Sequence, residues 1–296
     1  MPPRIGFIGF GEAGFHIASG LQTAGVSGIS ALDIHASDPT LGPLIRQRAA
    51  TSRTQLLPSS EQLAASCEIL FSAVTASSAR DAARQTTNYL TSRHTYVDLN
   101  SISPNLKREI QALVEPAGAR FVEAAVMAPV PPYGHRVPML LGGSSARQFS
   151  DSLSPYGMRF EVVSDTIGTA VAVKMCRSIV VKGLEALLFE CVMGASRYGA
   201  VDRVFASRQE SFPGIDWKNL TNYVVGRVVV HGERRAREME EVAETLRSSG
   251  VDPIMSEATA RLQDWSAHMD LKSHFGREGP SGYAEVLYII TNKTKP

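Results

Sequence analysis

One lysine in this sequence stands inside an otherwise apolar stretch, which reads GTAVAVKMCRSIVVKGLEAL and has the periodicity of a helix. Lys174 is followed at three, four and eleven residues by Arg177, Ser178 and Glu185, so these side chains share its helix face. Lys182 lies at the edge of that face. A lysine in an apolar setting with cationic neighbours loses proton affinity, which suits a general acid/base near neutral pH. A surface stripe in which Lys174 pairs with Glu185 explains the same spacing, and the residues alone leave both interpretations open.

A glycine pattern near the amino end can also do chemistry. Gly9, Gly11 and Gly14 form G-x-G-x-x-G between a strand-like run, RIGFI, and an amphipathic helix-like run. In a dinucleotide site the first glycine allows the tight turn, the second lets the backbone approach the pyrophosphate, and the third lets helix and sheet pack closely. The helix N-terminus offers N–H groups and a positive dipole end to the phosphates. An ordinary glycine turn is the simpler alternative, but the flanking elements favour dinucleotide binding.

An acidic residue stands at the distance that such a site requires. Asp33 ends the second strand-like run, ISALD, 19 residues after Gly14. A carboxylate there can accept hydrogen bonds from both ribose hydroxyls of NAD and would repel the 2′-phosphate of NADP. The sequence therefore favours NAD. NADP stays possible, because His35 and Ser37 lie close by and could help to hold a phosphate.

Two further segments could line a site. Asn100, Ser101 and Ser103 follow a strand-like run at its carboxyl end, where ligands bind in open α/β sheets, although the same residue types also form turns and helix caps. His231 begins HGERRAREMEE, which otherwise has the pattern of a solvated amphipathic helix.

Composition limits the classes of function. The chain has 296 residues, 44% hydrophobic and 20% charged, which is typical of a globular protein with a sizeable core. The net charge of +1 gives no sign of nucleic-acid binding or of an anionic membrane surface. Three scattered cysteines lack metal-ligand spacing, so we expect no metal site and a reducing, cytoplasmic setting. No signal peptide or membrane-spanning helix is expected.

The order of the elements predicts the fold. Strand-like and helix-like runs alternate through the first half, which indicates a Rossmann-type α/β fold with a doubly wound parallel sheet covered on both faces. Helical patterns dominate after a long helix of about nine turns that starts near residue 167. We predict an NAD(P)-binding domain over 1–165 and a mostly α-helical domain over 166–296.

These segments occur in the order of a known family. Residues 4–195 resemble the β-hydroxyacid dehydrogenases, which are related to 6-phosphogluconate dehydrogenase, and the resemblance lies in GFGEAG, DLNSISP, EAAVMAP and GTAVAVKMCRS. The carboxy-terminal part resembles a divergent branch of that family. The resemblance implies that Lys174 is the catalytic lysine and that the protein is a homodimer formed through its helical domain. It implies substrate contacts at Ser101, Arg177 and Ser178, and we add Met127 and His231 as expected substrate contacts. The expected cofactor contacts are Gly9, Gly11, Glu12, Ala13, Gly14, Asp33, Val74, Thr75 and Asn100.

The chain departs from the family where the substrate is held. Ala128 and Pro129 replace the glycines of the substrate loop, and proline has no N–H to donate to a carboxylate. Ser178 replaces a frequent amide, beside Arg177, which could bind a carboxylate or phosphate bidentately. We therefore expect an NAD(P)-dependent dehydrogenase of a small molecule, acting on a hydroxyl β to a carboxylate, with an unusual substrate. An imine reductase, an oxidative decarboxylase of the same fold and a non-catalytic NAD-binding sensor remain the alternatives.

Overall fold

Two compact units make up the chain. The computed structural model describes residues 2–275 and 279–293. One unit, Met1–Lys174, is called the amino-terminal unit below, and the other, Met175–Pro296, the carboxy-terminal unit. The first unit ends nine residues later than the predicted boundary at 165, because the backbone of Gly168 and Ala170 is hydrogen-bonded to Glu123 of the sheet.

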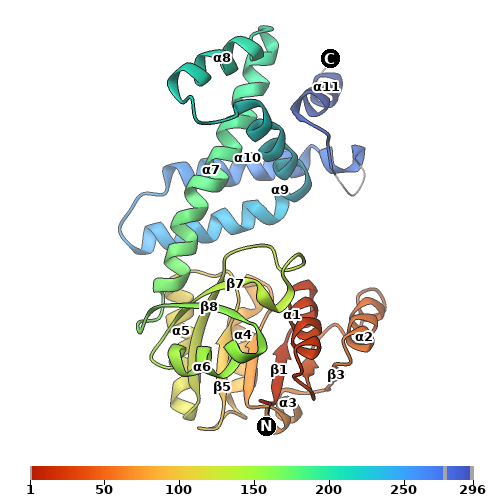
Figure 1. Cartoon of the computed structure of the whole chain (residues 1–296), viewed down its shortest axis with the longest axis vertical. Helices are drawn as coiled ribbons and strands as arrows, with labels where there is room; N and C mark the ends of the chain where they lie inside the picture. The colour runs from red at the N-terminus through yellow and green to blue at the C-terminus, as the bar shows by residue number, and fades with distance from the viewer. Residues whose placement is uncertain (1, 276–278, 294–296) are drawn as a thin grey trace. The chain divides into compact units, whose positions relative to one another are not determined.

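The amino-terminal unit is built on an eight-stranded sheet of order β3-β2-β1-β4-β5-β6-β7-β8 (Figure 1). The strands are β1 (Ile5–Ile8), β2 (Ser30–Leu32), β3 (Gln55–Leu56), β4 (Ile69–Ser72), β5 (Thr95–Asp98), β6 (Arg120–Val126), β7 (Pro138–Gly142) and β8 (Arg159–Ser164). The order reverses between β1 and β4, which is the switch point where open α/β sheets bind ligands. The doubly wound Rossmann-type prediction is confirmed.

One strand pair departs from the predicted parallel sheet. All neighbours pair in parallel except β6 and β7, which are antiparallel. The connection between these two strands spans only 127–137, which is too short for the crossover that a parallel pair needs. β7 therefore runs opposite to the direction that the predicted parallel sheet requires.

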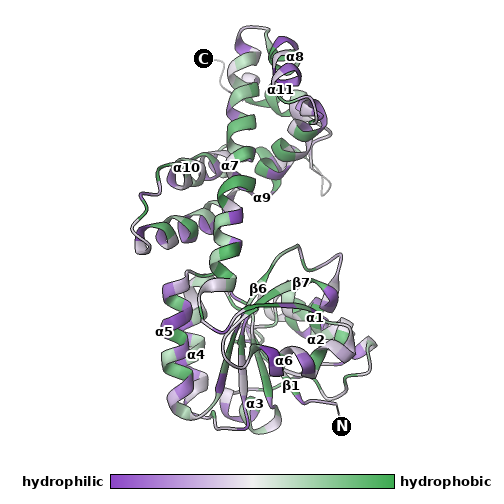
Figure 2. Cartoon of the chain, turned by 60° about the vertical axis from the view of Figure 1, so that its left-hand side comes forward, coloured by the Kyte–Doolittle hydropathy of each residue, from purple (hydrophilic) through white to green (hydrophobic). Residues whose placement is uncertain are grey.

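Helices cover both faces of this sheet (Figure 2). On one face, α1 (Glu12–Thr23), α2 (Gly42–Thr51) and α6 (Ala146–Leu153) pack through Ile17, Ile45 and Phe149. On the other face, α3 (Ser60–Ser66), α4 (Ala79–Thr87) and α5 (Pro104–Val114) pack through Leu63, Ala83 and Ile110. Because both faces are covered, β1, β4 and β5 are buried along their whole length, which explains their continuous apolar runs.

The carboxy-terminal unit is built from helices, as predicted. The chain enters it along α7 (Thr169–Arg197) and continues through α8 (Val201–Ser211), α9 (Trp217–Ser248), α10 (Ile254–His268) and α11 (Tyr283–Lys293). Its apolar core joins α7, α9 and α11 through Phe189, Val228 and Val286. Asp216 begins α9, because its carboxylate accepts a hydrogen bond from the Asn219 backbone N–H at 3.0 Å. The short 3-10 turns of the chain are 76–78, 115–117, 134–136, 154–156 and 271–274.

Candidate active site

In the turn between β1 and α1, close packing within the protein requires glycine at two of the three glycine positions. Gly9 has a φ of +84°, and a Cβ there would lie 2.6 Å from the Ala73 carbonyl oxygen. A Cβ at Gly14 would lie 2.9 Å from the Gly9 carbonyl oxygen, so this glycine lets α1 pack closely on the turn. Gly11 differs, because a Cβ there would meet nothing within 4 Å. The open space in front of Gly11 fits a ligand that approaches the backbone, as a dinucleotide pyrophosphate does.

The first turn of α1 presents its N–H groups to that space. Gly11 is the N-cap residue, its backbone is extended, and no described side chain caps the helix. The first hydrogen bond of the helix runs from the Phe15 N–H to the Gly11 carbonyl at 3.1 Å. The N–H groups of Glu12, Ala13 and Gly14 precede that bond and point out of the helix end. An anion at this end would gain those donors and the positive end of the helix dipole.

Asp33 connects the glycine turn to the end of β2. Its carboxylate accepts hydrogen bonds from the Phe10 N–H at 2.7 Å and from the His35 N–H at 2.9 Å, one on each oxygen. The side chain is half-buried. Each carboxylate oxygen can accept a second hydrogen bond, so the group can still accept two ribose hydroxyls while it holds the turn in place.

Asn100 joins the ends of β4 and β5. Its side-chain oxygen accepts the Val74 N–H at 2.8 Å, and its amide donates to the Ser72 hydroxyl at 2.9 Å. The residue is buried, so its amide is engaged within the protein, where it positions the loop that follows β4. Thr75 continues that loop, and its hydroxyl bonds the Ser77 and Ser78 hydroxyls at 3.1 and 2.9 Å.

The side chains of Lys174 and Ser101 are in direct contact. The sequence pattern was compatible with this contact but did not predict it. Ser101 lies three residues after β5, and Lys174 lies in the second turn of α7. The Lys174 ammonium donates a hydrogen bond of 2.5 Å to the Ser101 hydroxyl, and both residues are half-buried. Because β1, β4 and β5 are parallel, this pair lies at the same edge of the sheet as the glycine turn. A neutral amine can accept the proton of a substrate alcohol, and a hydroxyl beside it can position that alcohol.

Sequence reasoning missed a buried charged cluster beneath this pair. Asp98 at the end of β5 and Lys107 of α5 form an ion pair of 3.1 Å, and both side chains are fully buried. Glu123 of β6 is the register partner of Asp98 and is also fully buried. Its Oε1 accepts hydrogen bonds of 2.9 Å from both the Gly168 and Ala170 N–H groups, at the start of α7. A signal was present, since acids inside the buried runs YVDLN and FVEAAV are costly unless they are paired.

Burial raises the pKa of the Glu123 carboxyl above its ordinary value. The Lys107 ammonium and the N–H groups of Ala170, Gly168 and Val171 favour the ionised form and oppose this effect. One oxygen of Glu123 and one of Asp98 are buried without a hydrogen-bond partner among the described residues. One lysine therefore faces two buried carboxyl groups in this cluster.

The other predicted substrate contacts divide between the two units. Met127 belongs to the amino-terminal unit, directly after β6, where its N–H donates to the Pro138 carbonyl at 2.9 Å. Arg177 and Ser178 follow Lys174 along α7 but belong to the carboxy-terminal unit. Arg177 is exposed, whereas Ser178 is buried and its hydroxyl accepts the Lys182 ammonium at 3.0 Å.

Glu185 does not depend on Lys174 for its charge partners. It is buried, it pairs with Arg235 of α9, and it accepts a hydrogen bond of 3.3 Å from Gln263 of α10. Lys182 likewise pairs with Glu238 at 3.0 Å. Burial lowers the pKa of the Lys182 ammonium, and Glu238 opposes that shift. These pairs join α7, α9 and α10, so the alternative of a surface stripe that pairs Lys174 with Glu185 is wrong.

His231 of α9 is half-buried within the carboxy-terminal unit. Burial, together with the neighbouring charges of Arg234, Arg235, Arg227 and Lys272, lowers its pKa to about 4. The imidazole is therefore neutral at physiological pH and surrounded by cations, a setting in which it can donate or accept a hydrogen bond.

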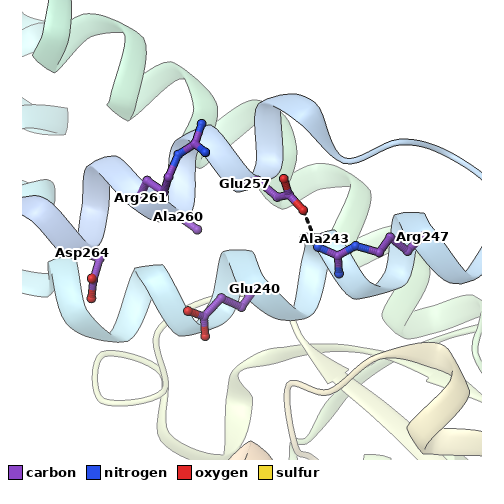
Figure 3. Close-up of a pocket in the computed structure, with 7 residues that line it drawn as sticks. All are labelled: Glu240, Ala243, Arg247, Glu257, Ala260, Arg261 and Asp264. Atoms are coloured by element: carbon purple, nitrogen blue, oxygen red, sulfur yellow. Dashed lines mark hydrogen bonds and ion pairs between the residues drawn. The ribbon is translucent and has the colours of Figure 1, made fainter.

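A cavity of about 400 Å³ lies between α9 and α10 (Figure 3). Charged residues of both helices line it, and Arg247 of α9 is ion-paired with Glu257 of α10. The small side chains in its lining are Ala243 and Ala260. None of the predicted site residues lines it. We interpret it as a salt-bridged seam between two helices.

No helix in the described ranges, 2–275 and 279–293, is long and apolar enough to cross a bilayer.

Two family models cover most of the chain. Residues 4–146 match the NAD binding domain of 6-phosphogluconate dehydrogenase, and residues 195–266 match a domain of unknown function, DUF1932. Among solved structures, a conserved hypothetical protein from Sinorhizobium meliloti is 34% identical over 99% of this chain and 97% of that one, with a TM-score of 0.81.

Two further structures relate the fold to dehydrogenases. A conserved protein of unknown function, reported as similar in structure to 3-hydroxyacid dehydrogenases, is 33% identical over 90% of this chain and 97% of that one, with a TM-score of 0.74. The 3-hydroxyisobutyrate dehydrogenase of Mycobacterium tuberculosis, solved with L-serine, is 16% identical over 98% of this chain and 99% of that one, with a TM-score of 0.74, and shares the fold. The chain therefore belongs to a divergent branch of the 3-hydroxyacid dehydrogenase and 6-phosphogluconate dehydrogenase-like family, in which a helical domain follows the NAD-binding domain.

Proposed function

We propose that this protein is an NAD-dependent oxidoreductase that interconverts a hydroxyl β to a carboxylate and the corresponding carbonyl. The observation that carries the proposal is the 2.5 Å hydrogen bond from the Lys174 ammonium to the Ser101 hydroxyl. It lies at the edge of the sheet where the glycine turn offers an anion cradle. A base and an orienting hydroxyl beside a dinucleotide site are the groups that alcohol oxidation needs.

The residues that would hold the cofactor are those around the glycine turn. The backbone of Gly11, Glu12 and Ala13 would bind the pyrophosphate, and Asp33 would accept the adenosine ribose hydroxyls. When bound, the nicotinamide supplies the hydride acceptor or donor. The Asp33 carboxylate supports NAD over NADP, because it would repel a 2′-phosphate. His35 is exposed and could help to hold the 2′-phosphate, so NADP is the second candidate.

Lys174 is assigned the proton transfer. In the oxidising direction its neutral amine accepts the proton of the substrate hydroxyl, and in the reducing direction its ammonium returns that proton to the forming alkoxide. Ser101 orients the reacting oxygen. The remaining substrate contacts are assigned to Met127 for an apolar group, to Arg177 for a carboxylate or phosphate, and to Ser178 and His231 for polar groups.

A second copy of the chain is the partner we propose for α7. Val180 and Leu187 are 71% and 55% exposed and lie seven residues apart, so they project from one face of the helix. Val181 is exposed beside them. A seven-residue apolar repeat on a long helix is the pattern that packs against another helix, which supports a homodimer through the helical unit.

The test is a screen for cofactor reduction at 340 nm with NAD and, separately, NADP. The panel contains hydroxy acids, aryl-bearing alcohols and phosphorylated sugar acids. Lys174→Ala is run beside Lys218→Ala, a control at an exposed lysine of α9. We expect turnover in the wild type and in Lys218→Ala, and a loss of turnover with retained NAD binding in Lys174→Ala.

Silence of the wild type across the panel, with NAD binding still visible by calorimetry, would contradict the proposal. That result would favour an imine substrate or a non-catalytic NAD-binding role. The altered substrate loop at Ala128 and Pro129 is the observation that supports these alternatives.

A further inference from the structure

Both partners of the Lys174–Ser101 pair are connected to one buried cluster, formed by Asp98, Lys107 and Glu123. On the Ser101 side, the Asp98 carboxylate accepts the Asn100 N–H at 2.8 Å and so fixes the loop that carries Ser101. The Lys107 ammonium bridges this region, since it pairs with the Asp98 carboxylate at 3.1 Å and donates to the Asp98 carbonyl at 2.8 Å. The loop is therefore held by groups that water does not reach.

On the Lys174 side, the cluster holds the start of α7. The Glu123 Oε1 accepts the N–H groups of Gly168 and Ala170, each at 2.9 Å. Ala170 and Lys174 are four residues apart, so they lie one above the other on the same helix face. Glu123 therefore anchors the N-terminal end of the helix from whose second turn Lys174 extends to Ser101.

The surrounding backbone is shaped to admit the Glu123 side chain. Gly142 is its register partner on β7, and a Cβ there would collide with the Glu123 carboxylate. Gly168 has a φ of +104°, a conformation that favours glycine, and this lets the chain turn into α7 with its N–H directed at Glu123. Gly142 and Gly168 therefore both make room for the contact between the Glu123 side chain and the start of α7.

We propose that Glu123 is a positioning residue, which fixes the first turn of α7 through its Oε1 and thereby places Lys174 against Ser101. The inference extends the proposed function, because it uses Lys174 as the group that moves the proton. The group that does the positioning is the Glu123 oxygen that accepts the two backbone N–H groups. A glutamine, which keeps that oxygen in the same place, should preserve the geometry, whereas a leucine of similar size should not.

The first measurement does not need turnover. The full-length chain is labelled with an amine-reactive reagent, and the labelling rate of each lysine is read by peptide mass spectrometry. Glu123→Leu should raise the labelling rate of Lys174 at least threefold, because the ammonium leaves the Ser101 hydroxyl, whereas Glu123→Gln should stay near the wild-type rate. Lys107 is fully buried, so its labelling reports unfolding of the amino-terminal unit and should stay unchanged.

The second measurement uses the substrate found in the screen. Glu123→Leu should lower kcat at least tenfold with little change in the KM for the substrate and in the Kd for NAD, and Glu123→Gln should restore most of kcat. Ser59→Ala is the matched control. Ser59 caps α3 of the same unit by accepting the Gln62 N–H at 3.2 Å, so its loss removes a helix cap away from Lys174.

Two outcomes would overturn the inference. Unchanged Lys174 labelling in Glu123→Leu would mean that α7 keeps its place without this contact. A parallel rise for Lys174 and Lys107 would mean that Glu123 only holds the fold. If Glu123→Leu does not fold, Glu123→Asp, which is one methylene shorter, must raise the labelling of Lys174 alone. The wild type could show no turnover while the labelling rate of Lys174 still rises in Glu123→Leu and not in Glu123→Gln. That result would refute the proposed chemistry and support the positioning role.

Discussion

The Lys174 ammonium lies 2.5 Å from the Ser101 hydroxyl, although 73 residues separate the two in the sequence. One residue comes from the loop after β5 and the other from α7. Their contact joins the lysine to which we assign proton transfer to the hydroxyl that we propose orients a substrate oxygen. Side chains that act as one unit are not independent, so their mutations should not be additive.

The first prediction follows from that coupling. Ser101→Ala should lower kcat by about 10- to 100-fold, and Lys174→Ala by about 10²- to 10⁴-fold, the usual contribution of a general acid/base. The double variant should be no slower than Lys174→Ala by more than about threefold, because Ser101 acts with the lysine. Steady-state kinetics on the four proteins gives the coupling energy. Additive losses would show that the two side chains act in separate steps.

The glycine turn offers a matched pair of substitutions. Gly11→Ala places its Cβ in open space with φ at −69°, so the stability of the protein without cofactor should stay within about 0.5 kcal/mol of the wild type. NAD should bind at least about tenfold more weakly, equal to about 1.4 kcal/mol, because the Cβ occupies the place of the approaching ligand.

Gly14→Ala should behave in the opposite way. Its Cβ would lie 2.9 Å from the Gly9 carbonyl oxygen, so the chain must shift and the protein should lose about 1–3 kcal/mol of stability before any cofactor binds. Urea unfolding and calorimetry with NAD separate the two effects. Wild-type NAD affinity in Gly11→Ala would show that the space in front of Gly11 is not the cofactor site.

Local pattern predicts some parts of this structure well. The turn from β1 into α1 depends on glycines whose φ values and close contacts are local properties, and the length of α7 follows from a continuous helical period. Asp33 was expected at the end of β2, and it lies directly after that strand, where it binds the glycine turn. The direction of β7 was missed, because the sequence predicted a parallel sheet. The pairing of this strand depends on its neighbours in the sheet.

Partner choice between distant segments could not be predicted. The helix period placed Glu185 on the same face of α7 as Lys174 and left open whether that face is buried, and its partners are Arg235 and Gln263, which follow it by 50 and 78 residues. Glu123 was not singled out, although it accepts the N–H of Gly168, 45 residues later, just before α7. A periodic pattern shows which face is buried. It does not show which charge meets it, because that is decided when the helices pack.

His231 makes acid stability testable. A histidine in the unfolded chain has a pKa of about 6.5. In the folded protein, burial and the surrounding cations lower it to about 4. Between these values the unfolded chain binds a proton that the folded chain does not, so the free energy of unfolding falls as the pH drops from about 6.5 to about 4. Because solvent screens a half-buried ring, we expect this loss to be about 1 kcal/mol.

His231→Gln should remove this loss. Its free energy of unfolding, measured with urea, should exceed that of the wild type at pH 5 by about 0.6 kcal/mol more than it does at pH 8. His274→Gln, at an exposed histidine of the same unit, is the control substitution measured at both pH values. A difference between His231→Gln and wild type that is the same at both pH values would rule out the proton as its cause.

The exposed face of α7 makes the oligomeric state testable. A dimer formed through Val180 and Leu187 would bury both side chains, and a lysine in either place would put a charge in that apolar contact at a cost of several kcal/mol. Light scattering on the eluted protein should give about twice the chain mass of 32.0 kDa for the wild type and a single chain mass for Leu187→Lys. Ile254→Lys, which changes a side chain 65% exposed on α10, should leave the dimer intact. A monomeric wild type, or a dimer that survives Leu187→Lys together with Val180→Lys, would exclude this face as the interface, because two opposed lysines cannot be buried there without partners.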